Sequence, residues 1–175
     1  LFGAALTYGA TGTTNYNEIA FAISSGSLLS HVYLSLGIGL LLIGFAFKVA
    51  LVPFHMWSPD VYQGAPTPIT GFLCTAPKAA GFGALINLFI TAFPEVYPLW
   101  QNLFWILAAL SMTVGNISAL VQNNVKRMLA FSSISHAGYI LIGALVFNSN
   151  GISAVLFYFA VYSAMNLGAF SIISI

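Results

Sequence analysis

Two lysines of this chain, Lys48 and Lys78, lie inside long apolar segments, whereas its five other charged residues lie in polar connections. A lysine at the centre of a membrane helix costs about 2.5–3.5 kcal/mol on insertion scales, so such residues usually mark an ion or proton path. Two ammonium groups close together in a poorly solvated interior disfavour each other's charge, and burial acts in the same direction. These residue types in this setting therefore predict proton transfer.

The two lysines are expected at similar depth in a bilayer. Lys48 precedes Asp60 by 12 residues, and Lys78 follows Thr67 by 11 residues, on two antiparallel segments joined by one turn. The alternative for each lysine is snorkelling, in which the ammonium group reaches the membrane surface along its own alkyl chain. Their central position in the apolar segments disfavours that alternative.

Pro53 predicts a break in the segment that contains Lys48. A proline removes one intrahelical hydrogen bond and frees a carbonyl group, which water or a polar side chain must satisfy at membrane depth. We therefore expect a broken helix between Lys48 and Pro53. His55 follows Lys48 by seven residues, so the two share a face if the helix resumes with little change of phase. His55 is then a candidate proton relay, and an anchor at headgroup level is the alternative.

A second group of polar residues falls within one apolar segment near the C-terminal end of the sequence. Its members recur at i, i+3, i+4 and i+7, which predicts one polar stripe on a helix. Such hydroxyl groups also form structural hydrogen bonds between membrane helices, and this alternative stays open. The secondary relay candidates, with His136 foremost, are Ser132, Ser135, His136 and Tyr139.

Membrane helices are needed to position these residues. The chain is 59% hydrophobic and 4% charged, whereas about a quarter of the residues of a soluble domain are charged. A straight span needs about 20 apolar residues. The sequence thus predicts an all-α polytopic transmembrane helix bundle, one transmembrane domain over residues 1–175, with TGTTNYNEIAFAISSG as an aqueous connection. The predicted spans are 1–10 (partial), 28–60 (broken), 67–93 (interrupted by Pro77), 97–121, 128–147 and 152–175.

Charge and cysteine content exclude several other classes of protein. A net charge of +1 gives no basic surface for nucleic acid, and the single Cys74 allows neither an internal disulfide nor a cysteine-ligated metal centre. Lys126 and Arg127 form the one basic connection, which places it and Asp60 on the cytoplasmic side. Both ends fall inside apolar stretches, so we expect a fragment. No acidic residue lies at membrane depth, so an anionic partner for the lysines is expected outside these residues.

The stretch FKVALVPFHMWSPDVYQGAPTPITGFLCTAPKAA, followed by NVKRMLAFSSISHAGYILIG, resembles the antiporter-like subunits N of proton-pumping NADH:quinone oxidoreductase, respiratory complex I (subunit 2 in mitochondria). The resemblance implies an antiporter-like bundle in which Lys48 is a central protonatable group and Lys78 continues a lateral hydrophilic axis. His55 matches a position tied to proton access. The family's partner glutamate precedes Leu1, and its second broken helix with a further lysine follows Ile175.

The function implied is proton translocation by a non-redox subunit of that enzyme. We expect no cofactor in this chain, with NADH, FMN, iron–sulfur clusters and quinone on other subunits. The expected partners are the other membrane-arm subunits, the lipid bilayer and protons, in the bacterial cytoplasmic membrane or, alternatively, an organelle membrane. Two rival functions remain: a subunit of a multi-subunit cation/proton antiporter that moves sodium or potassium, and a structural subunit whose lysines pair with acids on neighbours.

Overall fold

The computed structural model describes residues 1–26 and 31–174, and all regular elements in these ranges are helical. The all-α prediction is confirmed. In chain order the helices are α1 (Phe2–Thr11), α2 (Tyr16–Ser24), α3 (His31–Val49), α4 (Trp57–Gly64), α5 (Thr67–Ala92), the 3-10 helix η2 (Pro94–Val96), α6 (Tyr97–Leu120), α7 (Val125–Leu145) and α8 (Ser149–Ile173).

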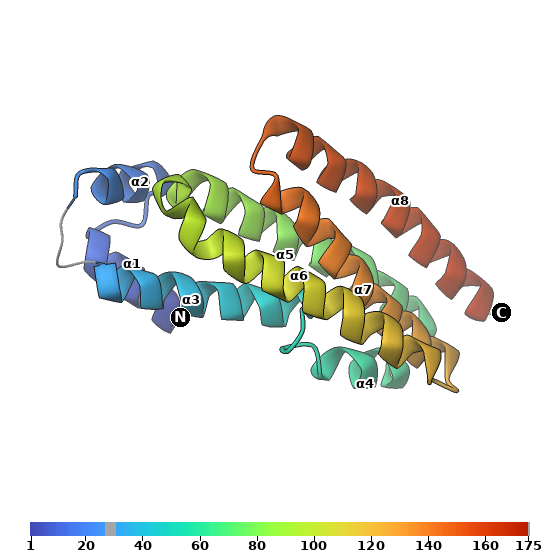
Figure 1. Cartoon of the computed structure of the whole chain (residues 1–175). Helices are drawn as coiled ribbons and strands as arrows, with labels where there is room; N and C mark the ends of the chain where they lie inside the picture. Colours follow the sequence, from blue (N-terminus) through green and yellow to red (C-terminus); the bar gives the residue numbers. More distant parts are fainter. Residues whose placement is uncertain (27–30, 175) are drawn as a thin grey trace.

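Five of the described helices, α3 and α5 to α8, are long and apolar enough to cross a membrane. They form one elongated bundle in which helices that follow one another are antiparallel (Figure 1). The chain is therefore a multi-pass membrane protein. The last four predicted spans agree with α5 to α8 to within three residues, and the partial span 1–10 corresponds to α1. The first residues of the predicted span 28–60, and residue 175, lie outside the described ranges.

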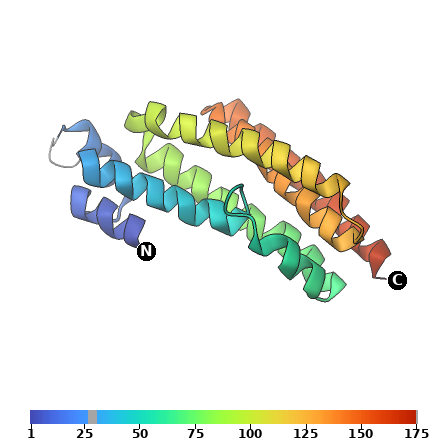
Figure 2. The same ribbon diagram turned by 60° about the horizontal axis from the view of Figure 1, so that its bottom comes forward.

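The predicted broken helix is confirmed, but α3 ends before Pro53. Ala50 has a left-handed backbone with φ of 59° and follows the last helical residue, Val49. Its N–H donates to the Phe47 carbonyl oxygen, and the Leu51 N–H donates to the Ala46 carbonyl oxygen. These two bonds form a Schellman motif, which closes the helix. The chain then turns through residues 51–56 and begins α4, as Figure 2 shows.

The predicted interruption at Pro77 is wrong, because α5 runs without a break from Thr67 to Ala92. A proline inside a helix lacks the N–H that would bond to the carbonyl group four residues earlier. Here that carbonyl belongs to Leu73, and the Tyr62 hydroxyl group donates to its oxygen over 3.1 Å. A side chain from α4 thus supplies the missing donor, and the helix continues.

The predicted aqueous connection contains a helix, α2, that its amino-acid composition did not predict. The Asn15 side chain accepts a hydrogen bond from the Asn17 N–H and caps the helix, and Glu18 lies in its first turn, where the helix dipole favours an acid. Ile19 is buried in the main hydrophobic core. A cap and one buried apolar residue were enough to order a segment whose composition is typical of a loop.

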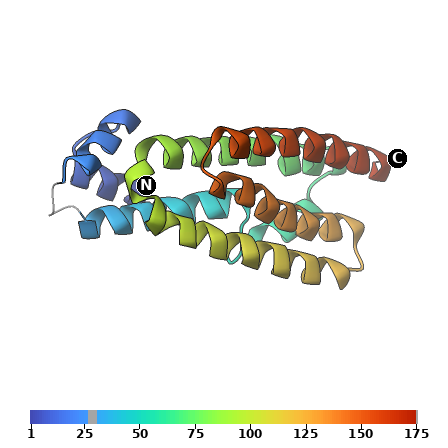
Figure 3. The ribbon, with the colours of Figure 1, turned by 45° about the horizontal axis from the view of Figure 1, so that its top comes forward.

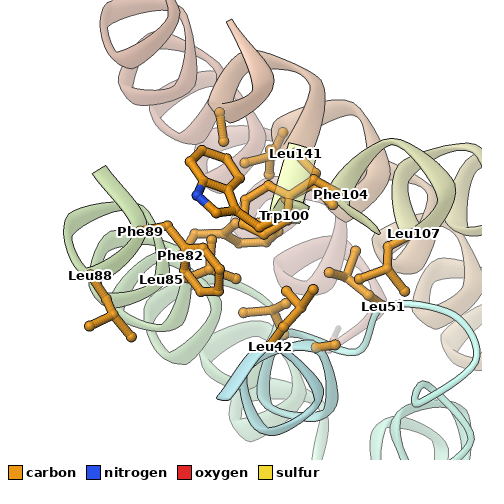
Figure 4. Close-up of a cluster of buried hydrophobic side chains, with 14 of the residues drawn as sticks. Leu42, Leu51, Phe82, Leu85, Leu88, Phe89, Trp100, Phe104, Leu107 and Leu141 are labelled. Atoms are coloured by element: carbon orange, nitrogen blue, oxygen red, sulfur yellow. The ribbon is translucent and has the colours of Figure 1, made fainter. Parts of the chain in front are cut away.

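The core is richest in aromatic side chains where the end of α5 meets the start of α6 (Figure 4). Phe89 contacts Trp100 and Phe104 with ring centroids 5.5 and 5.0 Å apart, and the Trp100 indole N–H donates to the Phe93 carbonyl oxygen. This cluster occupies the end of the bundle opposite α4. The buried polar groups described next lie nearer the middle of the bundle, where α8 runs alongside α5 and α7 (Figure 3).

Candidate proton-relay site

Lys78 lies in the interior of the bundle, with only 2% of its surface exposed. Its Nζ donates to the Ser133 hydroxyl oxygen at 2.5 Å and to the Ser133 carbonyl oxygen at 3.1 Å, both on α7. The Tyr62 ring on α4 lies below the ammonium group, with its centroid 6.0 Å away. Lys78 therefore does not snorkel, and its charge is solvated by neutral oxygen atoms and an aromatic face.

Tyr162 on α8 completes the surroundings of Lys78. Its hydroxyl group donates to the Ser133 Oγ at 2.8 Å, and the residue is 2% exposed. The acidic residues of the chain are Glu18, Asp60 and Glu95. Glu18 and Asp60 lie in the short helices α2 and α4, and Glu95 lies in η2, at the very start of the span that continues as α6. Within the described chain, the buried ammonium group thus has hydroxyl and carbonyl partners and no carboxylate.

Lys48 lies in the last turn of α3 and is exposed on the described chain. A Cβ added to Gly81 of α5 would lie 3.5 Å from the Lys48 Cγ, so Lys48 lies beside Gly81. Gly81 is three residues beyond Lys78, which is about 4.5 Å of helix rise. The prediction of similar depth is confirmed to within one helical turn. Lys48 also lines a groove of about 210 Å³ between α1 and α3, with Leu41 and Gly44 among its other lining residues.

His55 lies in the turn between α3 and α4 and is 7% exposed, with its ring edge-on to Phe131 of α7. Its Nδ1 has no hydrogen-bond partner in the described chain. The condition under which His55 would share a helical face with Lys48 is not met, because α3 ends at Val49 and α4 begins only at Trp57. Its buried, unpartnered nitrogen still makes it a candidate for proton access, which stays a prediction.

The single stripe predicted on α7 is divided between two neighbouring helices. His136 Nδ1 lies 2.6 Å from the Tyr158 hydroxyl oxygen on α8, whereas Tyr139 accepts a 3.4 Å hydrogen bond from Asn116 on α6. Ser135 also faces α6, against Gly115, and its hydroxyl oxygen has no partner among the described residues. The spacing identified the helix surface correctly, but that surface is wide enough to contact both neighbours.

Ser132 is half-buried and makes no side-chain hydrogen bond within the described residues. Its neighbour Ser133, which contacts Lys78, was missed because the spacing was counted from Ser132. A signal was present in the sequence, since the spacing places Ser133 on one helical face with the small residues Ala130 and Ala137. In the structure all three are buried. Tyr162 was also predictable, because Tyr158, Tyr162 and Asn166 recur every four residues along α8.

Two aromatic residues of α4, Trp57 and Tyr62, connect the two lysine-bearing helices. The Trp57 indole N–H donates to the carbonyl oxygen of Phe47, next to Lys48, over 2.8 Å. Tyr62 donates to the Leu73 carbonyl oxygen and faces Lys78. The two rings meet edge to face, with centroids 6.2 Å apart. We call Trp57 and Tyr62 the α4 aromatic pair.

The connection between α6 and α7 lies against α4 at the same end of the bundle. Arg127 forms an ion pair with Asp60, and Lys126 Nζ donates to the Ala65 carbonyl oxygen at 2.8 Å. Asp60 and the basic connection therefore lie at the same end of the bundle, and the cytoplasmic location of that end stays a prediction. The Asp60 side chain is 71% exposed, so the ion pair adds little stability.

The antiparallel membrane helices enclose Lys78, and α3 ends immediately after Lys48. This arrangement defines an antiporter-like membrane protein. Residues 1–175 match the family model described as NADH:quinone oxidoreductase/Mrp antiporter, TM. The chain belongs to this family.

Individual relatives agree with this family. NADH-quinone oxidoreductase subunit N of Trichlorobacter lovleyi is 53% identical over 173 residues, which are 99% of this chain and 36% of that protein. A chain in the structure of respiratory complex I from Thermus thermophilus with bound aureothin is 42% identical, with a TM-score of 0.79 over 99% of this chain and 36% of that one. This chain spans about a third of the length of the curated relatives it matches.

The Mrp complex from Dietzia sp. shares the fold. Its matching chain has a TM-score of 0.85 at 24% identity, over 98% of this chain and 31% of that one. At that identity the match shows the fold alone.

Proposed function

We propose that this chain forms the central part of a proton-translocating subunit N of NADH:quinone oxidoreductase. The principal observation is that Lys78 is buried at membrane depth with neutral partners. A carboxylate beside a lysine favours the charged form of the lysine, so the proton leaves less readily. A lysine among hydroxyl and carbonyl groups gains and loses a proton more readily.

The proposed route runs from Lys48 to Lys78 and on toward α8. Lys48 lies within one turn of Lys78 in depth, and His136 with Tyr158 lies on the α8 side of α7. His55 supplies access from the end of the bundle that contains α4. A carboxylate elsewhere in the full-length subunit is proposed as the partner of Lys48, which lines the groove between α1 and α3.

The proposed role in the enzyme is translocation without redox chemistry. We propose that NADH, FMN, iron–sulfur clusters and quinone are bound by other subunits, and that the other membrane-arm subunits are the partners of this chain. The proposed location is the bacterial cytoplasmic membrane, in agreement with the bacterial source of the relatives. The support for this role is the similarity to subunit N over nearly all of the chain.

The test is Lys78→Ala in the full-length subunit within the assembled complex. NADH-driven proton pumping into inverted membrane vesicles is expected to fall to the background of uncoupled membranes, because the exchangeable proton is lost. Lys126→Ala is the matched control, since Lys126 bonds to a carbonyl at the membrane surface, and it is expected to pump normally. Normal pumping by the Lys78→Ala complex would contradict the proposal. Sodium-dependent transport in the same vesicles would favour the cation/proton antiporter instead.

A further inference from the structure

Ser133 accepts both of the hydrogen bonds that the Lys78 side chain donates within the described residues. The lysine donates to both the hydroxyl and the carbonyl oxygen of this one residue, and Ser133 is 1% exposed. On its other side, the same hydroxyl oxygen accepts a hydrogen bond from Tyr162. Lys78 on α5, Ser133 on α7 and Tyr162 on α8 thus form one continuous hydrogen-bonded group.

We propose that Ser133 is a positioning residue that holds Lys78 in both of its protonation states. This inference rests on the proposed function, because it requires Lys78 to gain and lose a proton. A carbonyl oxygen accepts hydrogen bonds and cannot donate them, so it helps the ammonium form alone. A hydroxyl group has one O–H donor and two acceptor lone pairs, so it can serve both forms of the lysine.

The two states differ by one proton on Nζ and in the direction of the hydrogen bond between Nζ and the Ser133 Oγ. When Lys78 is charged, its Nζ donates to the Ser133 Oγ, as the structure shows. When Lys78 is neutral, its nitrogen has a lone pair, and the Ser133 O–H turns to donate to it. Tyr162 donates to the second lone pair of the Ser133 Oγ in either state. The Nζ therefore stays in place while its charge changes.

Packing around Ser133 agrees with this role. Ala130 and Ala137 are the small neighbours on the same face of α7 and are fully buried, which leaves room for the lysine side chain. Tyr162 approaches from α8 and fixes the hydroxyl oxygen from the far side. A residue that served packing alone would not need its oxygen atom between two donors.

The test compares three substitutions of Ser133 in the full-length subunit within the assembled complex. Ser133→Ala removes the hydroxyl group, Ser133→Cys keeps the size but bonds weakly, and Ser133→Thr keeps the hydroxyl group and adds a methyl. Pumping is expected to fall on the order of tenfold in the first two variants, as for the loss of one hydrogen bond to a charged group. Ser133→Thr is expected to stay within about twofold of the unsubstituted complex. Packing alone would give the reverse order, with Cys tolerated better than Thr, and that result would overturn the inference.

A double-substitution cycle provides a second measurement if Ser133→Thr fails to assemble. Tyr162→Phe is expected to lower pumping less than Ser133→Ala does, and the double variant is expected to be no worse than Ser133→Ala, because both act on one hydrogen-bonded group. Losses that multiply would overturn the inference. Tyr97→Phe is the matched control, since it also removes one hydroxyl donor, which bonds here to the Leu145 carbonyl oxygen at the far end of the bundle.

Lys78→Ala in the same membranes separates the two proposals. If it abolishes pumping while Ser133→Ala and Ser133→Cys pump normally, the role of Ser133 is overturned and the proposed function stands. If Lys78→Ala itself pumps normally, the proposed function fails, and the inference fails with it.

Discussion

Lys48 and Lys78 lie at similar depth on adjacent helices, but their surroundings are opposite. Lys78 belongs to a helix that continues past a proline, and the bundle encloses its ammonium group with neutral oxygen atoms. Lys48 is the penultimate residue of a helix that stops, and it is exposed toward a groove. The enclosed lysine has its hydrogen-bond partners within the described chain, whereas the exposed one is the lysine for which we propose a carboxylate partner from elsewhere in the subunit.

The largest expected contrast between the two lysines is the effect of removing each charge. Lys78→Met replaces an ammonium group that has no counter-ion among the described residues, so the free energy of unfolding is expected to stay unchanged or rise by up to about 3 kcal/mol. Lys48→Met is expected to lower it by about 3–5 kcal/mol, because the proposed carboxylate partner would be left buried and unpaired. Both substitutions are expected to abolish pumping. Unfolding of the full-length subunit in mixed micelles by SDS titration measures the two free energies.

The sign of the change is the decisive result in that experiment. Equal changes in the free energy of unfolding for the two variants would contradict the proposed carboxylate partner of Lys48. Lys126→Met is the control, because the Lys126 ammonium group is at the membrane surface, and a change below about 0.5 kcal/mol is expected there.

The α4 aromatic pair explains how two helices with weakened backbones are held side by side. Each side chain donates a hydrogen bond to a carbonyl group on a lysine-bearing helix. The Trp57 indole N–H donates to Phe47 on α3, and the Tyr62 hydroxyl group donates to Leu73 on α5. The Phe47 carbonyl is at a helix end, but the Leu73 carbonyl is inside a helix and lacks a backbone donor because of Pro77. Loss of the hydrogen bond from Tyr62 is therefore expected to destabilise the bundle more than loss of the hydrogen bond from Trp57.

Tyr62→Phe is expected to lower the free energy of unfolding by about 1–3 kcal/mol, because it leaves the half-buried Leu73 carbonyl group without a donor. Pro77→Ala restores the missing backbone N–H. In a Pro77→Ala background, Tyr62→Phe is thus expected to cost less than about 0.5 kcal/mol. The four proteins of this double-mutant cycle are compared by SDS titration. An equal cost of Tyr62→Phe in both backgrounds would show that its hydroxyl group does not replace the backbone donor.

The sequence predicted the helices well because long apolar segments leave the backbone few alternatives in a bilayer. It also located both lysines, since a charge within an apolar segment is conspicuous. It failed where a contact between distant residues decided the outcome: Pro77 does not interrupt α5 because Tyr62 supplies a donor from another helix. Ser133 was overlooked for a related reason, because periodicity shows which residues share a face but not which helix that face meets.

Trp57→Phe is expected to have the smallest effect, about 0.5–1 kcal/mol on the free energy of unfolding. It removes the hydrogen bond to the Phe47 carbonyl oxygen, but this carbonyl also accepts from the Ala50 N–H, and Trp57 is only half-buried. The contrast with Tyr62→Phe measures the difference between a carbonyl at a helix end and one inside a helix beside a proline. If Trp57→Phe lowered the free energy of unfolding more than Tyr62→Phe does, the hydrogen bond between α4 and α3, rather than the one between α4 and α5, would hold the two lysine-bearing helices together.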